Sequence, residues 1–194
     1  MCGQAWSDSA PSFLGMWTAM MAAMMLPSLA PMLQRYHRAA GIRRTALVGA
    51  GYFCVWSVLG IAVFAVVTAQ AAFAMDVPIA AGPISVGLVV LVAGLFQFTP
   101  WKARRLACCR EAALRPSATD GTAWRHGLHL GRDCVICCAN LTAILLVIGV
   151  MNLAAMAFVT AAITLERLAP AGDKVARAIG VVIVGVGVVL IAIA

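Results

Sequence analysis

The sequence is short of charged residues, and acidic residues are the scarcer kind. Only 11% of its 194 residues are charged, and Asp and Glu together number 7. An ordinary soluble domain is about a quarter charged, so this chain has too little polar surface to cover a globule in water. Since it also has only 3 histidines, catalytic classes that need a solvated cleft lined with acids and histidines are not expected.

Hydrophobic residues make up 63% of the chain, and its mean hydropathy is +0.99. This composition predicts an all-α fold in which transmembrane helices form one bundle, a single domain over residues 1–194. Residues 1–11 contain no Lys or Arg, so the basic start of a cleavable signal peptide is missing. The first apolar stretch is therefore expected to remain in the mature protein.

Six apolar stretches are predicted to cross the membrane, since about 20 apolar residues span a hydrocarbon core. They are about 12–33, 45–73, 79–99, 131–148, 151–166 and 178–194. Pro27 and Pro31 are expected to kink or end the first helix. Residues 134–166 could also form one long tilted helix, which would leave five spans. A hairpin turning near Gly149 is preferred, because it keeps all basic connectors on one side.

Lys and Arg concentrate in three connectors, at 34–44, 100–130 and 167–177. The positive-inside rule predicts that these connectors are cytoplasmic loops, with the N-terminus and the 74–78 link outside. The same residues account for the net charge of +7, because anionic lipid headgroups attract basic residues beside membrane spans. Nucleic acid is not an expected partner, since the chain has no aromatic-basic interleave and no known nucleic-acid module.

Cys134, Cys137 and Cys138 form the sharpest local pattern. Their spacing of i, i+3 and i+4 puts three thiols on one face of a helix. The predicted topology places this face at the cytoplasmic mouth of the fourth span. Thiols stay reduced there, so a metal site or a redox pair is favoured over a permanent disulfide. Thiolates select Cu(I) or zinc over magnesium and calcium. The preceding connector could add further ligands: Cys108, Cys109, His126 and His129.

Methionines in the first span are the second concentration of sulfur. Two stripes with a spacing of four residues run along one side of the predicted helix: Met16, Met20 and Met24, and beside them Met21 and Met25. Thioethers bind Cu(I) and reject hard cations. Both groups of sulfur residues have an alternative interpretation, since free Cys and Met are also ordinary packing residues.

Four polar residues fall within predicted spans, where polar groups are costly unless they meet a partner or a cavity. Gln97, Asn140 and Asn152 are expected to form hydrogen bonds between helices. Glu166 is followed at once by Arg167, so it is expected at the membrane interface, in contact with water.

In their order along the chain, residues between Met16 and Gly180 resemble a bacterial family of predicted metal-binding integral membrane proteins, a domain of unknown function. The matching residues are Trp17, Met20, Ala23, Met24, Met25, Pro27, Gly51, Tyr52, Trp56, Gln97, Pro100, Lys102, Cys109, Arg110, Gly131, Cys134, Cys137, Cys138, Gly149, Met151, Asn152, Met156, Glu166, Pro170 and Gly172. The resemblance implies a multi-pass, metal-binding protein of the bacterial inner membrane.

The chain departs from the family pattern at two positions. Ala139 replaces the aromatic residue that usually follows the paired cysteines, which is expected to enlarge the space beside the thiols. Arg167 replaces the usual Lys after the acidic residue. Because the charge is retained there, an interfacial ion pair with Glu166 is expected to survive.

The sequence therefore favours an integral membrane protein that binds a soft transition metal, copper before zinc, for metal handling, delivery or transport. The expected ligands are Cys134, Cys137, Cys138, Cys109, Met20, Met21, Met24 and Met25. The expected partners are the lipid bilayer, a membrane or periplasmic protein, or a second copy of the chain. One alternative is a structural or assembly subunit whose sulfur residues only pack. A membrane-bound metal-dependent oxidoreductase ranks lower, because all the histidines fall in connectors.

Overall fold

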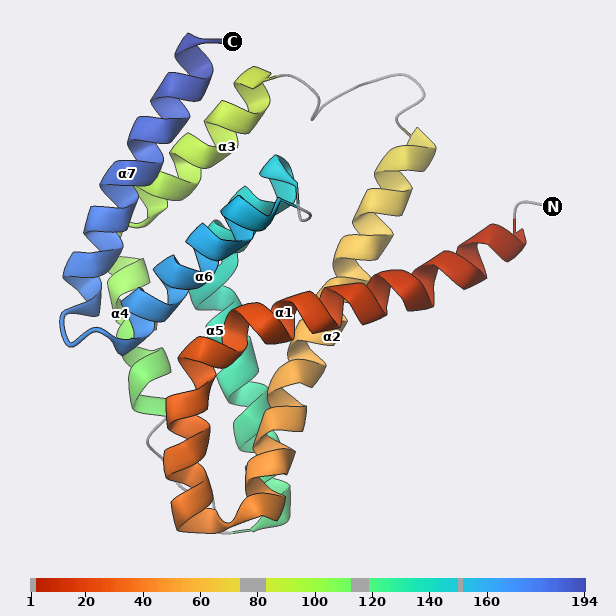
Figure 1. Ribbon diagram of the computed structural model, residues 1–194, viewed down its shortest axis with the longest axis vertical. Helices are drawn as coiled ribbons and strands as arrows, with labels where there is room; N and C mark the ends of the chain where they lie inside the picture. The colour runs from red at the N-terminus through yellow and green to blue at the C-terminus, as the bar shows by residue number, and fades with distance from the viewer. Residues whose placement is uncertain (1–2, 74–82, 113–118, 150–151) are drawn as a thin grey trace.

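A computed structural model describes residues 3–73, 83–112, 119–149 and 152–194 of the chain (Figure 1). These residues form helices and no strand, in agreement with the predicted all-α fold. The helices are α1 (Gly3–Ala40), α2 (Ile42–Phe73), α3 (Pro83–Phe96), α4 (Pro100–Ala112), α5 (Asp120–Ile148), α6 (Leu153–Leu168) and α7 (Gly172–Ala192). Cys2, Met151 and the predicted 74–78 link lie outside the described residues.

Four of these helices are long and apolar enough to cross a membrane, namely α1, α2, α5 and α7. A fifth candidate is the pair α3 and α4, which are bent by 70° at the break between them. The helix α6 has only 16 residues. The number of membrane spans, which the sequence puts at about six, therefore stays a prediction.

The first helix continues into the predicted connector at 34–44 and ends at Ala40. Pro27 and Pro31 both lie inside α1 and do not end it, but the helix changes direction where its colour passes from red to orange in Figure 1. A proline removes one backbone hydrogen bond and so allows such a bend. Gly41 follows the end of the helix, and its φ of 80° is a left-handed conformation that favours glycine.

The segment predicted as a connector at 100–130 is also mostly helical. The backbone breaks at Thr99, whose hydroxyl accepts a hydrogen bond from the Lys102 N–H at 3.3 Å, and Pro100 starts α4 where no N–H is needed. Lys102, Leu106 and Cys109 are all buried. Their spacing of four and three residues places them on one face of α4, which therefore packs into the bundle.

The long apolar stretch after Cys134 divides into α5 and α6. Gly149 ends α5 with a φ of 115°. The Asn152 side chain then caps α6 by accepting a hydrogen bond from the Ala155 N–H at 3.1 Å. Asn152 is therefore a helix cap, and the predicted interhelical role is wrong for this residue. Since α5 starts already at Asp120, Cys134 and Cys138 lie near the middle of this helix. Their position at the cytoplasmic mouth of a membrane span stays a prediction.

Glycines set the spacing between α2 and α5. A Cβ atom on Gly51 would come within 2.7 Å of the Trp124 carbonyl, and one on Gly131 within 2.9 Å of the Tyr52 carbonyl. Gly127 faces the Val48 carbonyl still more closely. These approaches leave no room for a side chain, so the two backbones lie in contact and Tyr52 is held against α5.

We expect Gly127→Ala to destabilise the protein. The added methyl group has to push the Val48 backbone away, and overpacking of this kind typically costs about 1–3 kcal/mol. Gly121→Ala on the same helix is the matched control, because a Cβ there meets nothing within 4 Å, and alanine has the higher helix propensity. Thermal unfolding of the purified variants measures the difference. Equal midpoints for the two variants would contradict the close packing.

Candidate metal centre

Three buried thiols lie on one face of α5. Cys134, Cys137 and Cys138 are each at most 1% exposed. The sulfur atoms of Cys134 and Cys138 are 3.9 Å apart, and the thiol of Cys137 lies close to that of Cys138. The predicted sharing of one face is therefore confirmed.

A fourth thiol comes from α4. Cys109 is buried, and its thiol lies close to that of Cys137. Its neighbour Cys108 is exposed, because consecutive residues of a helix point in directions about 100° apart. Cys109, Cys137, Cys138 and Cys134 thus form a continuous row of sulfur atoms, which is called the thiol row below.

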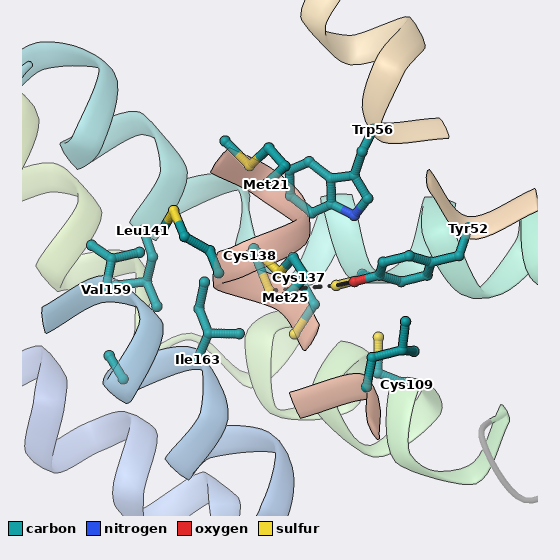
Figure 2. Close-up of a cluster of buried hydrophobic side chains, with 14 of the residues drawn as sticks. Met21, Met25, Tyr52, Trp56, Cys109, Cys137, Cys138, Leu141, Val159 and Ile163 are labelled. Atoms are coloured by element: carbon teal, nitrogen blue, oxygen red, sulfur yellow. Dashed lines mark hydrogen bonds between the residues drawn. The ribbon is translucent and has the colours of Figure 1, made fainter. Parts of the chain in front are cut away.

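Two aromatic residues of α2 border one end of the thiol row. The Tyr52 hydroxyl donates a hydrogen bond to Cys134 Sγ at 3.0 Å (Figure 2). Trp56 is fully buried, and its Nε1 has no hydrogen-bond partner among the described residues. In Figure 2 this nitrogen lies on the side of the ring that faces the Tyr52 hydroxyl. The end of the row at Cys134 therefore has the Tyr52 hydroxyl as a hydrogen-bond donor.

Methionines of α1 belong to the same buried cluster. Met21, Met24 and Met25 are buried, and Met20 is partly buried against the cluster. Met16, which starts the predicted stripe, is exposed. Figure 2 shows Met21 and Met25 among the residues that surround the cysteines. The structure thus brings together the eight predicted ligand residues in one core, while their role as ligands stays a prediction.

A buried ion pair lies beside the thiol row. Lys102 Nζ is 2.9 Å from Glu166 Oε2, and both side chains are at most 1% exposed. Gln97 donates to Glu166 Oε1 at 2.6 Å. The expectation that Glu166 meets water at an interface is therefore wrong. An inward-facing lysine on α4 supplies the charge that makes burial of the carboxylate tolerable.

Lys102 also ties this ion pair to α5. Its ammonium group donates to the Cys137 carbonyl at 2.7 Å and to Asn140 Oδ1 at 3.4 Å. Asn140 in turn donates to the Ala93 carbonyl at 3.2 Å. The predicted interhelical hydrogen bonds are thus confirmed for Asn140 and Gln97.

Arg167 is buried without a carboxylate partner in the part of the chain that the structure describes. The sequence suggested an ion pair between Arg167 and Glu166, and the structure does not contain it. Instead, Arg167 Nη1 donates to Ser28 Oγ at 3.1 Å and to Cys134 Sγ at 3.4 Å. Neighbouring residues of α6 point to different sides, so Glu166 faces α4 while Arg167 faces the thiol row.

Ala139 is exposed and lines an apolar cleft between α3 and α5 together with Leu88, Val92 and Phe96. The space opened by the missing aromatic residue is therefore outside the bundle. The expectation that it lies beside the thiols is wrong, because position 139 follows the buried pair on the opposite side of the helix.

These ligand residues suit a soft monovalent ion better than an ion that needs four ligands in a tetrahedral arrangement. Among the described residues, no three His, Cys, Asp or Glu side chains are arranged to hold a metal ion together. The thiols form a row instead, with thioethers nearby, and thiolates and thioethers are ligands that select Cu(I). Neither His126 nor His129 joins them: His129 is exposed and His126 stacks on Tyr36.

Lys102, Arg167 and Tyr52 are the residues whose part in the site was not anticipated. The resemblance includes Lys102 and Tyr52, but neither carries a recognisable ligand pattern. The signal for Lys102 was available in its spacing from Leu106 and Cys109, which puts one charge on an otherwise apolar helix face.

A family model described as PpoB2, copper chaperone, matches residues 14–190. The match runs from α1 to α7 and includes every residue of the thiol row. No curated protein and no solved structure matches the chain.

We expect Lys102→Met and Glu166→Met each to lower the free energy of unfolding by about 3–5 kcal/mol, since each leaves one buried charge unpaired. The double variant should lose less than either single variant, because apolar groups replace both charges. Asp173→Asn is the control, as it breaks an exposed pair with Arg177 that is worth at most about 1 kcal/mol. Chemical unfolding measures the free energy of unfolding of the two single variants, the double variant and the control. Additive losses in the double variant would refute the pairing.

Proposed function

The chain belongs to the PpoB2 family of copper chaperones, and on this premise we propose that it carries Cu(I) as cargo, within a membrane, at the thiol row. The observation that carries the proposal is a set of four buried thiols lined by methionines and contacted by Arg167, which has no carboxylate partner among the described residues. Soft sulfur ligands in a water-free site favour Cu(I) over the hard cations.

The charges beside the thiol row support a monovalent cargo. Lys102, Arg167 and Glu166 together contribute one net positive charge in the bundle interior. Cu(I) held by two thiolates has a net charge of minus one, so its binding neutralises this charge. Zn(II) held by the same two thiolates is neutral and leaves the positive charge uncompensated. Because uncompensated buried charge costs several kcal/mol, the surroundings favour copper.

The outward faces of the helices support insertion in a membrane. Large apolar side chains are exposed along α2, α3 and α7, whereas soluble monomers rarely expose contiguous apolar patches of this extent. Examples are Val58, Ile61, Val66 and Val67 of α2, Leu88, Val92 and Leu95 of α3, and Val181, Val182, Val186 and Val189 of α7. The proposed location is the bacterial inner membrane, with the N-terminus outside and the basic α1–α2 turn in the cytoplasm.

Delivery follows from the position of the methionines. Met21, Met24 and Met25 provide neutral, weaker ligands along α1 beside the stronger thiolates of the row. An ion can therefore exchange between weak and strong soft ligands without meeting water. The recipient in this proposal is a membrane or periplasmic protein that lies against the bundle.

We expect the purified protein to bind Cu(I) tightly in an anaerobic titration against a coloured Cu(I) chelator. Changing Cys134, Cys137 and Cys138 together to Ser should abolish this binding. The matched control changes Cys54 and Cys108 to Ser, since these thiols lie outside the row, and should bind as the wild type does. Equal Cu(I) binding by the triple variant and the control would overturn the proposal and favour a packing role.

Arg167→Gln should weaken Cu(I) binding by about 10- to 100-fold, because a hydrogen bond to a charged group contributes about 1.5–3 kcal/mol. Arg167→Lys retains the charge and should recover most of the affinity. Arg177→Gln changes an exposed arginine and should have no effect. The dissociation constant from the same titration measures all three, and unchanged affinity in Arg167→Gln would refute the electrostatic role.

A further inference from the structure

Tyr36 and His126 form an isolated aromatic pair at the end of the bundle where α1 turns into α2. Their ring centroids are 6.1 Å apart and their planes are inclined by only 12°, so the rings stack. Tyr36 belongs to the last turns of α1 and His126 to the first turns of α5. Neither residue takes part in the network around the thiol row.

Both rings carry a polar atom that is buried and unused. Tyr36 Oη and His126 Nε2 have no hydrogen-bond partner among the described residues. Leaving such a group unsatisfied costs about 1–3 kcal/mol, and a phenylalanine would stack at either position without that penalty. An unsatisfied buried group in a native structure needs a reason, and a ligand that binds at the site is one.

The two rings continue the sulfur-lined face of the bundle. On α1, the buried Met32 lies one turn before Tyr36, so its side chain is on the same face. On α5, His126, Leu130 and Cys134 are spaced four residues apart and also share a face. At about 1.5 Å per residue, His126 is about 12 Å from Cys134 along the helix.

We propose that the His126 imidazole and the Met32 thioether form a second, weaker Cu(I) site, between the thiol row and the α1–α2 turn. This inference rests on the proposed function. An imidazole nitrogen and a thioether are both accepted Cu(I) ligands, and the unused Nε2 is the lone pair that such a site needs. Because both ligands are neutral, the bound ion keeps its charge, so the site holds copper less strongly than the thiolates do.

The charged residues near His126 agree with a site that holds Cu(I) only briefly. Arg43 and Arg44 lie at this end of the bundle and both pair with Asp120, at 3.1 and 3.5 Å. A carboxylate that is already shared by two arginines does not compensate a further cation. A Cu(I) ion beside His126 therefore binds in a positive field, which suits a transfer site rather than a storage site.

The test is a Cu(I) titration of the intact protein past one equivalent, combined with X-ray absorption at the copper edge. We expect the wild type to bind a second, weaker Cu(I), with imidazole nitrogen scattering that appears only above one equivalent. His126→Phe should weaken this second event at least tenfold, remove the nitrogen signal and leave the first event unchanged. Met32→Leu should weaken the same event.

Matched controls separate a ligand from a packing residue. His129→Phe and Met16→Leu make the same substitutions at exposed positions and should leave both binding events intact. His126→Phe retains the ring that stacks on Tyr36, so the thermal midpoint of the copper-free variant should equal or exceed that of the wild type.

Three results would overturn the proposal. A second event and a nitrogen signal that persist in His126→Phe would overturn the His126 site while leaving the thiol row as the copper site. A wild type that binds no Cu(I), or a triple Cys variant that binds the first equivalent normally, would overturn the proposed function together with this inference.

Discussion

Three ionised side chains buried among apolar helices, Lys102, Glu166 and Arg167, are the constraint on which the rest of the structure depends. Each would be prohibitively costly alone, since an unpaired buried charge costs several kcal/mol. For Lys102 to reach Glu166 at 2.9 Å, α4 has to lie inside the bundle. This in turn requires the break at Thr99 and Pro100. The short helix α6 then presents neighbouring residues to opposite partners, Glu166 to α4 and Arg167 to α1 and α5.

The excess positive charge lies where the thiols are. Arg167 contacts Cys134 Sγ and no carboxylate of the described chain, and Lys102 contacts the carbonyl of Cys137. Among the described residues, an anion in the thiol row is therefore the remaining means of neutralising this positive charge. This physical need connects the polar network to the proposed copper chemistry, because a Cu(I) ion with two thiolates has the charge that the protein lacks.

Much of this fold follows from the sequence, because long apolar stretches and the spacing of Cys134, Cys137 and Cys138 are local features. The roles of residues that depend on tertiary contacts were harder to predict from the sequence. Lys102 lies in a basic segment that looks like a connector, and the proximity of Glu166, 64 positions later, is a property of the packed bundle. The sequence assigned Arg167 to Glu166, which is the wrong partner, because its real contacts also depend on how the helices pack. Tyr52 reaches Cys134 only because glycines bring α2 and α5 into contact.

Ligand charge changes along the common face of α1 and α5, and this gradient bears on how a carrier releases its cargo. Cys134, Cys137 and Cys138 lie near the middle of α5, where the nearby cations favour the thiolates that hold Cu(I) in the proposed function. Toward the α1–α2 turn the available ligands are neutral, Met32 and His126, and the nearby arginines oppose a cation. In the proposed function, a copper ion that moves along this face therefore passes from a stronger site to a weaker one. In this proposal, a ligand of a membrane partner that reaches this end has to compete only with the weakest copper site of the chain.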